Sequence, residues 1–145
     1  MKASTAQFSI AEGDEGLAER LESELLSSLA LNQEQAINTG FTLSANDSEG
    51  ELIGGLVAST SYSWLLVKIL WVKESQRNLG VGRSLMAAAE AKARELGCHS
   101  VWLDTSNAKA KQFYDVLGYE VFGQLENLEG HIPPDHCRWF MKKVL

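Results

Sequence analysis

The spacing of apolar residues along the chain predicts three helices. In the first helix, leucines recur every four residues, at Leu17, Leu21, Leu25 and Leu29. This spacing puts them on one helix face, and Asp14 just before them is a residue type that caps helix N-termini. The segments 80–96 and 107–117 also carry apolar residues at helical spacing, which predicts one helix in each. A glycine follows each of these two segments, as is common where helices end.

Alternating and continuous apolar runs predict strands. Phe8 and Ile10 alternate with polar residues and predict a short first strand. Residues 39–46 and 52–60 flank the turn sequence DSEG and predict a hairpin. The run WLLVKILWV at 64–72 is too short and too rich in bulky apolar residues for an amphipathic helix, so we expect a buried central strand. The remaining predicted strands are 99–104, 119–124 and 136–144.

The order of these elements predicts a mixed α+β fold. One strand and one helix are followed by three strands, and then by a helix, a strand, a helix and two strands. Strands that alternate with helices require a parallel pair within an otherwise antiparallel sheet. We therefore expect one three-layer α/β domain over residues 1–145, with a mixed, mostly antiparallel central sheet flanked by helices. A chain of 145 residues is long enough for one hydrophobic core.

Charge and cysteine content narrow the set of partners. The chain carries 13 Lys and Arg against 19 Asp and Glu, a net charge of −6, with a pI near 5.0. Such a field repels nucleic acid and anionic membranes and suits a cationic substrate. Cys98 and Cys137 form no CxxC pair, which argues against a disulfide framework or a zinc ribbon. We expect a cytoplasmic protein with no nucleic-acid or membrane partner.

The segment 72–83 contains the main chemical signal, because glycines open a helix directly after a strand and a loop. The first amides of a helix have no partner in the helix and carry about half a positive charge, so Gly80 and Gly82 favour an anion such as phosphate. A tight turn without a ligand is the alternative. A P-loop would require Gly-Lys-Ser or Gly-Lys-Thr, which is missing, and a dinucleotide turn would require glycine where Leu85 stands.

Two motifs in this order and separation resemble those of one family. Arg77-x-x-Gly80-x-Gly82 resembles the Arg/Gln-x-x-Gly-x-Gly/Ala motif of the GNAT superfamily, the acetyl-CoA-dependent N-acetyltransferases. The segment NAKAKQFYDVLGY at 107–119 resembles the second signature, Asn-x-x-Ala-x-x-(aromatic or Leu)-Tyr-x-x-Leu-Gly-(Phe/Tyr). The resemblance covers about residues 52–123 and implies the acyl-CoA N-acyltransferase fold.

The resemblance also implies acetyl-CoA as co-substrate and no metal. The pyrophosphate would lie on the turn formed by Arg77, Asn78, Leu79, Gly80, Val81, Gly82 and Arg83. The pantetheine would pair with the backbone of Leu70 and Val72 and bond to Asn107, entering where the central strand and the 99–104 strand separate. Trp64 and Trp71, on the central strand, are expected in the core rather than in an acceptor pocket.

By the same resemblance, Tyr114 is the catalytic residue, donating a proton to the departing CoA thiolate. The alternative is a core tyrosine that packs on Tyr119. Relatives often carry a glutamate on the central strand as base, but no acidic residue lies between Glu51 and Glu74. We expect ordered water or a residue of another loop to take the proton, with Glu126, Glu129 and His131 as candidates.

The expected function is transfer of acetyl from acetyl-CoA to a primary amine of a small molecule or peptide. The amine would attack the thioester directly in a ternary complex, without a covalent enzyme intermediate. The alternative is a non-catalytic acyl-CoA sensor or interaction module, favoured only by the missing glutamate. The first helix and the loop 126–134 are expected to select the acceptor, and a homodimer agrees with the resemblance.

Overall fold

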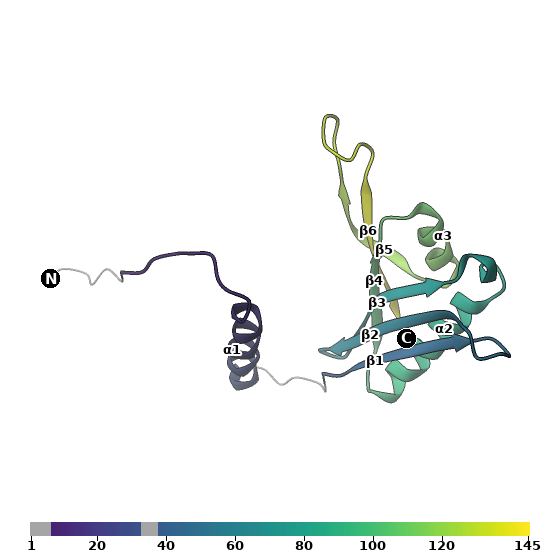
Figure 1. The fold of residues 1–145 in the computed structure, drawn as a ribbon, viewed down its shortest axis with the longest axis horizontal. Coiled ribbons are helices and arrows are strands. Elements are labelled where there is room, and N and C mark those ends of the chain that lie inside the picture. Colours follow the sequence, from purple (N-terminus) through teal and green to yellow (C-terminus); the bar gives the residue numbers. More distant parts are fainter. Residues whose placement is uncertain (1–6, 33–37) are drawn as a thin grey trace. The chain divides into compact units, whose positions relative to one another are not determined.

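The computed structural model describes residues 7–32 and 38–145. The chain divides into two compact units between residues 34 and 35, and each unit is described by itself. The single domain expected over 1–145 stays a prediction. Figure 1 shows the elements of both units.

The N-terminal unit contains the predicted leucine helix but not the predicted first strand. Helix α1 spans Leu17–Asn32, and the Leu17 amide donates to the Asp14 carbonyl at 3.2 Å. Residues 7–14 form no regular structure, and Phe8 and Ile10 are 81% and 89% exposed. The predicted strand is therefore wrong for the described residues, because local alternation cannot stabilise a strand that has no partner strand for its hydrogen bonds.

The second unit is a six-stranded sheet with two α-helices. Its elements are β1 (Gly40–Asn46), β2 (Leu52–Ser61), β3 (Trp64–Val72), a 3-10 turn η1 (Glu74–Gln76), α2 (Val81–Glu95), β4 (Ser100–Thr105), α3 (Ala108–Val116), β5 (Glu120–Glu126) and β6 (Cys137–Val144). The strand order is β1-β2-β3-β4-β6-β5, and only β3 and β4 are parallel. The predicted mixed, mostly antiparallel sheet is confirmed (Figure 1).

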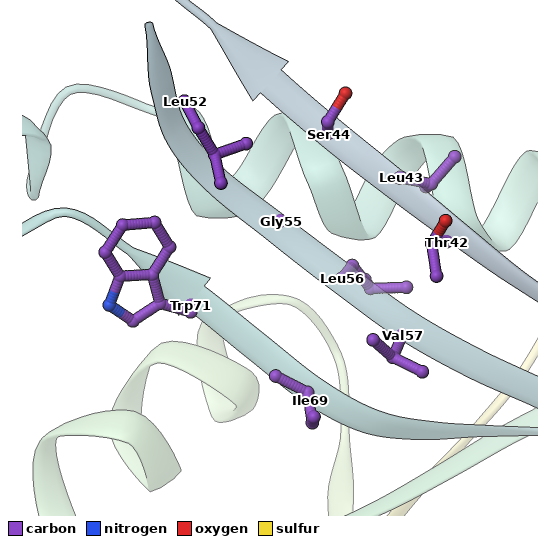
Figure 2. A pocket seen from close by; sticks show the side chains of 9 residues that line it. All are labelled: Thr42, Leu43, Ser44, Leu52, Gly55, Leu56, Val57, Ile69 and Trp71. Carbon is purple, nitrogen blue, oxygen red and sulfur yellow. The ribbon is translucent and has the colours of Figure 1, made fainter.

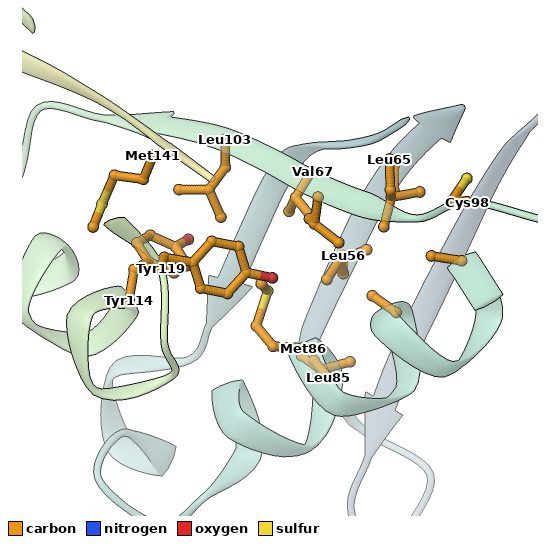
Figure 3. Packing of buried hydrophobic residues seen from close by; sticks show 14 residues of the cluster. Leu56, Leu65, Val67, Leu85, Met86, Cys98, Leu103, Tyr114, Tyr119 and Met141 are labelled. Atoms are coloured by element: carbon orange, nitrogen blue, oxygen red, sulfur yellow. The ribbon is translucent and has the colours of Figure 1, made fainter. Parts of the chain in front are cut away.

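Helix α2 packs closely on β2 because β2 carries a glycine where they meet. A Cβ placed on Gly54 would lie 3.1 Å from Val81 Cγ1 and 3.3 Å from Leu85 Cδ1. Side chains of α2, α3 and the strands β2, β3, β4 and β6 form one buried core (Figure 3), and partly buried side chains of β1 pack against it. Its largest fully buried side chains are Leu56, Leu65, Met86, Leu103, Met141 and Val101.

A β-bulge changes which side chains of β3 face the core. Val57 pairs with Ile69, but the next residue of β2, Ala58, pairs with Val67, so the register skips Lys68. An extra residue reverses the alternation beyond it. Ile69 and Trp71 are consequently 55% and 44% exposed, and the expectation that Trp71 belongs to the core is wrong.

Strands β3 and β4 pair over only three residues before they separate. The parallel ladder runs from Trp64 opposite Ser100 to Leu66 opposite Trp102. Beyond it, β3 stays paired with β2 as far as Val72, and β4 stays paired with β6 as far as Thr105. The sheet therefore contains a gap between the C-terminal halves of its two central strands, where the sequence analysis expected the strands to separate.

Candidate active site

The turn that joins β3 to α2 leads into a helix start with free backbone amides. Asn78 and Gly80 have φ values of 63° and 89°, in the left-handed region. At Gly80, the N-cap of α2, a side chain would be strained. No side chain caps this N-terminus, and its first turn holds no acidic residue. An anion with several oxygens, such as a diphosphate, fits such a group of amides.

Arg77 holds this turn against the end of β3. Its Nε donates to the Val72 carbonyl at 3.0 Å. The contact ties the arginine side chain to the end of β3, and the expected role of Arg77 in a pyrophosphate-binding turn stays a prediction. It also engages one of the two backbone groups of Val72, a residue expected to pair with pantetheine. Val72 and Leu70 are both half-buried on the strand that borders the gap.

Gly82 brings the two sequence motifs into contact. A Cβ on this glycine would lie 3.2 Å from Cζ of Phe113 in α3 and 3.7 Å from Cγ2 of Val72. A bulkier residue would push α3 away from the start of α2. The helix N-terminus of the first motif and the helix of the second motif therefore adjoin each other at the end of β3.

Asn107 has a structural task at the start of α3. Its Oδ1 accepts hydrogen bonds from the amides of Lys109 and Ala110, at 2.9 and 3.1 Å. This is the side-chain N-cap that satisfies two otherwise unpaired helix amides. The Asn107 side-chain NH2 group takes no part in the cap, so a contact with pantetheine, as the resemblance implies, is compatible with it.

Tyr114 combines a buried ring with a phenol that keeps its proton. Its side chain is 7% exposed, and its ring makes edge contacts with Phe113 and Tyr119, at centroid distances of 5.2 and 5.9 Å. Burial, and secondarily the charge of Asp104, raises the pKa of Tyr114 to about 12. The core packing considered as an alternative role is therefore present, and the phenol is also in the protonated state that a proton donor requires.

Tyr119 lies deeper in the same cluster. It is 3% exposed, and its hydroxyl has no hydrogen-bond partner among the described residues. Burial, together with the charge of Glu90, raises the pKa of Tyr119 well above its usual value. Glu90 is itself buried and forms an ion pair with Lys143 of β6. A charged pair and two protonated phenols thus lie between α2, α3 and β6.

Asp104 is the residue near this site that sequence reasoning missed. Its place beside the gap follows from the strand pairing. It belongs to the end of β4, two residues past the last pair with β3. The acidic residue that the central strand lacks is therefore present on the strand across the gap.

The three residues named as candidate bases occupy the far end of the β5–β6 hairpin. Glu126 pairs with Cys137, two pairs beyond the level at which β4 ends opposite Trp139. Glu129 and His131 belong to the exposed loop that follows, where His131 Nδ1 accepts from the Leu128 amide at 2.8 Å. Figure 1 shows this hairpin extending past the rest of the sheet.

Two hollows lie on β1 and its neighbours. One, of about 370 Å³, adjoins the turn before α2, and its lining includes Gly80, Val81 and Ser84. The other, of about 460 Å³, is on the sheet face away from α2, and Figure 2 shows Trp71, Ile69 and Val57 along it. The first hollow borders the turn before α2 that suits an anion, and the second borders β3 beside the bulge.

The cysteines and metal-binding residue types form no further site in the described part of the chain. Burial raises the pKa of the Cys98 thiol, which suits a packed side chain better than a nucleophile. No group of three His, Cys, Asp or Glu residues with metal-site geometry occurs among residues 7–32 and 38–145. Within the same residues, no helix has the length and apolar character needed to cross a membrane, and the expected cytoplasmic location stays a prediction.

Comparison with known proteins relates the sequence to acetyltransferases. The model of the acetyltransferase (GNAT) family matches residues 7–119. The chain is 35% identical over 83 residues to acetyltransferase Atu2258 of Agrobacterium fabrum, covering 57% of this chain and 61% of that protein. It is 44% identical over 73 residues to blasticidin-S acetyltransferase of Streptomyces morookaense, covering 50% of this chain and 54% of that protein. The chain thus spans between half and two thirds of these curated relatives.

Solved structures share the fold over a longer part of the chain. A crystal structure of an acetyltransferase from Bacillus cereus has a TM-score of 0.83 at 27% identity, covering 95% of this chain and 98% of that one. PaiA N-acetyltransferase of Thermoplasma acidophilum, solved with coenzyme A, has a TM-score of 0.60 at 20% identity, covering 88% and 70%. The similarity to the second structure concerns the fold alone.

Proposed function

Because the chain belongs to the acetyltransferase (GNAT) family, we propose that it transfers the acetyl group of acetyl-CoA to a primary amine of a small molecule or peptide. The amine attacks the thioester while both substrates are bound. The acyl donor binds at the turn before α2 and in the gap between β3 and β4. Its acceptor is cationic at neutral pH, in keeping with the net charge of −6.

The contact between Gly82 and Phe113 is the observation that carries this proposal. It joins a helix start suited to a diphosphate with the helix that holds Tyr114. A molecule with a diphosphate at one end and a thioester at the other can therefore span from the turn to the phenol along the edge of β3. Pantetheine supplies amide groups for the unpaired edge of a strand.

Each group in the site has a defined task in thioester aminolysis. The amides of Gly80 to Arg83 bind the diphosphate, and the edge of β3 between Leu70 and Val72 aligns the pantetheine. Tyr114 donates its phenolic proton to the sulfur as the C–S bond breaks. A thiolate is a weak base compared with an alkoxide, so we expect this donation to contribute at the lower end of the 10²–10⁴-fold typical of general acids.

The acceptor is sought among cationic amines, which form the test panel. The relative from Streptomyces morookaense is named for blasticidin S, which makes this compound one member of a test panel. Polyamines, an aminoglycoside and a peptide with free lysine complete it.

The expected homodimer stays a prediction.

The test measures free thiol released from acetyl-CoA in the presence of each amine. We expect release that depends on at least one amine, with acetyl-CoA bound at micromolar concentration. Tyr114→Phe should lower kcat and leave the Kd for acetyl-CoA near that of the wild type. Acetyl-CoA binding without release for any amine would instead favour a sensor or interaction module, the alternative function.

A further inference from the structure

We propose that Asp104 receives the amine of the acceptor at the gap between β3 and β4 and takes its proton as the new N–C bond forms. This inference rests on the proposed function and adds the missing base to it. The role falls to β4 rather than to the central strand β3, where relatives often carry a glutamate.

The register of the central strands fixes the sheet face on which Asp104 lies. Side chains alternate between faces along a strand. Val101 and Leu103 of β4 are fully buried in the core beneath α2 and α3, at 0% and 1% exposure. Asp104 therefore points to the opposite face. It lies past the Leu66–Trp102 pair, so no residue of β3 pairs with it.

The pairing of β4 with β6 also places Asp104 on the sheet face away from the helices. Asp104 pairs with Phe140 of β6, and Thr105 pairs with Trp139. The Trp139 ring is approached by Lys111 of α3 at 6.0 Å, so Trp139 is on the helix-covered face and Phe140 is on the other. Since paired residues share a face, Asp104 lies away from α3.

Tyr114 approaches the same gap from the helix side. It is part of the core cluster that includes Leu103 and Met141. Burial, and secondarily the charge of Asp104, raises the pKa of Tyr114, in keeping with a carboxylate near the phenol. A thioester in the gap would thus meet a proton donor on one side and a carboxylate on the other.

The Asp104 carboxylate is accessible and only loosely paired. Its side chain is 38% exposed, and Arg138 Nε lies 3.7 Å from its Oδ1. An exposed pair at this distance contributes little energy, so an incoming ammonium can compete for the carboxylate oxygens. On β3, the exposed Ile69 and Trp71 lie on the same face and offer apolar surface for the body of the acceptor.

The step is balanced in protons and electrons. The acceptor ammonium loses one proton to solvent and becomes a neutral amine held by Asp104. Its nitrogen lone pair forms the N–C bond, its second proton moves to Asp104, and the electrons of the C–S bond leave with sulfur. Sulfur takes the proton of Tyr114, and solvent carries the Asp104 proton back to the phenolate. The products are the amide, free CoA and one proton.

The test compares three variants in the thiol-release assay with acetyl-CoA and the best amine of the panel. Asp104→Asn keeps the size and removes the base, so we expect kcat to fall at least about 100-fold. Asp104→Glu keeps a carboxylate and should remain at least tenfold faster than Asp104→Asn. Glu120→Gln, which removes an exposed carboxylate from edge strand β5, should match the wild type.

Acetyl-CoA affinity and thermal unfolding provide the structural control. Both should be unchanged in Asp104→Asn, because the residue is partly exposed and lies on the acceptor side. The role is overturned if kcat stays within threefold of wild type, if Asp104→Glu is no faster than Asp104→Asn, or if acetyl-CoA affinity falls as much as kcat. In those cases the proposed function stands, whereas a wild type that acetylates no amine overturns both.

Discussion

The ring of Phe113 occupies the space that a side chain on Gly82 would need, since a Cβ on this glycine would lie 3.2 Å from Phe113 Cζ. Gly82 lies in the first turn of α2, the helix that follows β3, and Phe113 precedes the tyrosine proposed as proton donor. The close approach of the two helices therefore depends on the missing side chain. This contact brings the predicted diphosphate turn close to the helix that carries Tyr114, although 31 positions separate Gly82 from Phe113 in the sequence.

Gly82→Glu should weaken acetyl-CoA binding by about tenfold or more, which corresponds to about 1.4 kcal/mol. The new carboxylate repels the diphosphate at the positive end of α2, and its stem displaces Phe113. Isothermal titration calorimetry measures the Kd. The matched control is Ala87→Glu, which adds the same charge to an exposed position in the middle of α2. Equal affinities of the two variants would contradict the placement of the diphosphate.

The substitution Asn107→Asp distinguishes the role of Asn107 as N-cap of α3 from its expected contact with pantetheine. An aspartate accepts from the amides of Lys109 and Ala110 as the asparagine does, so the melting temperature should stay within about 2 °C of wild type. It has no NH2 group, so acetyl-CoA should bind severalfold more weakly. Asn107→Ala should cost about 1 kcal/mol of stability as well. Unchanged affinity in Asn107→Asp would leave Asn107 with the cap alone.

The free energy of unfolding should decline as pH rises above about 10. Burial raises the pKa of Tyr114 to about 12, so the folded chain holds this proton more tightly than the unfolded chain does. The stabilisation is complete below the unfolded pKa and is lost as pH approaches the folded one. For a shift of two units this amounts to roughly 3 kcal/mol.

Urea unfolding at several pH values between 8 and 11 measures this loss. Tyr114→Phe should reduce the dependence, because it removes one titrating group from the core and leaves the contribution of Tyr119. Tyr62→Phe, at a 42% exposed position, should retain the wild-type slope. A slope that is the same in all three proteins would show that Tyr114 is not desolvated as the structure has it.

Lys143→Met should destabilise the protein by about 3–5 kcal/mol, because it leaves the Glu90 carboxylate buried without its partner. The Glu90 side chain is 8% exposed. The control, Lys92→Met, breaks an exposed pair with Glu95 at 4.0 Å and should cost less than about 1 kcal/mol. The double variant Glu90→Met with Lys143→Met should recover much of the loss. Chemical denaturation gives the three values, and a loss under 1 kcal/mol for Lys143→Met would contradict the pairing.

The elements of the second unit could be predicted from local patterns because each pattern has a local cause. Gly80 and Gly97 mark the two ends of α2, where positive φ angles favour glycine. Asp47 makes the predicted hairpin turn, its Oδ1 accepting from the amides of Glu49 and Glu51. The strand expected at Phe8 and Ile10 was wrong, because alternation alone does not provide a partner for hydrogen bonds.

The exposed side of β3 could not be predicted, because it depends on a bulge in the pairing with β2. Apart from Lys68, the residues of β3 are all apolar and show no alternation, and nothing in the strand marks Lys68 as the residue that the register skips. Trp71 was consequently expected in the core. The position of Asp104 across the gap was missed for a similar reason, since it follows from which strands pair and where they stop.

The sequence by itself determined the kinds of elements, the helix start suited to an anion and the family to which both motifs point, because these depend on residues close together along the chain. Only the tertiary structure decided that Phe113 packs against Gly82, that Trp71 faces outward and that Asp104 lies beside the gap on the sheet face away from α3. These relationships arise from strand register and helix packing, whose energies depend on contacts between segments far apart in sequence.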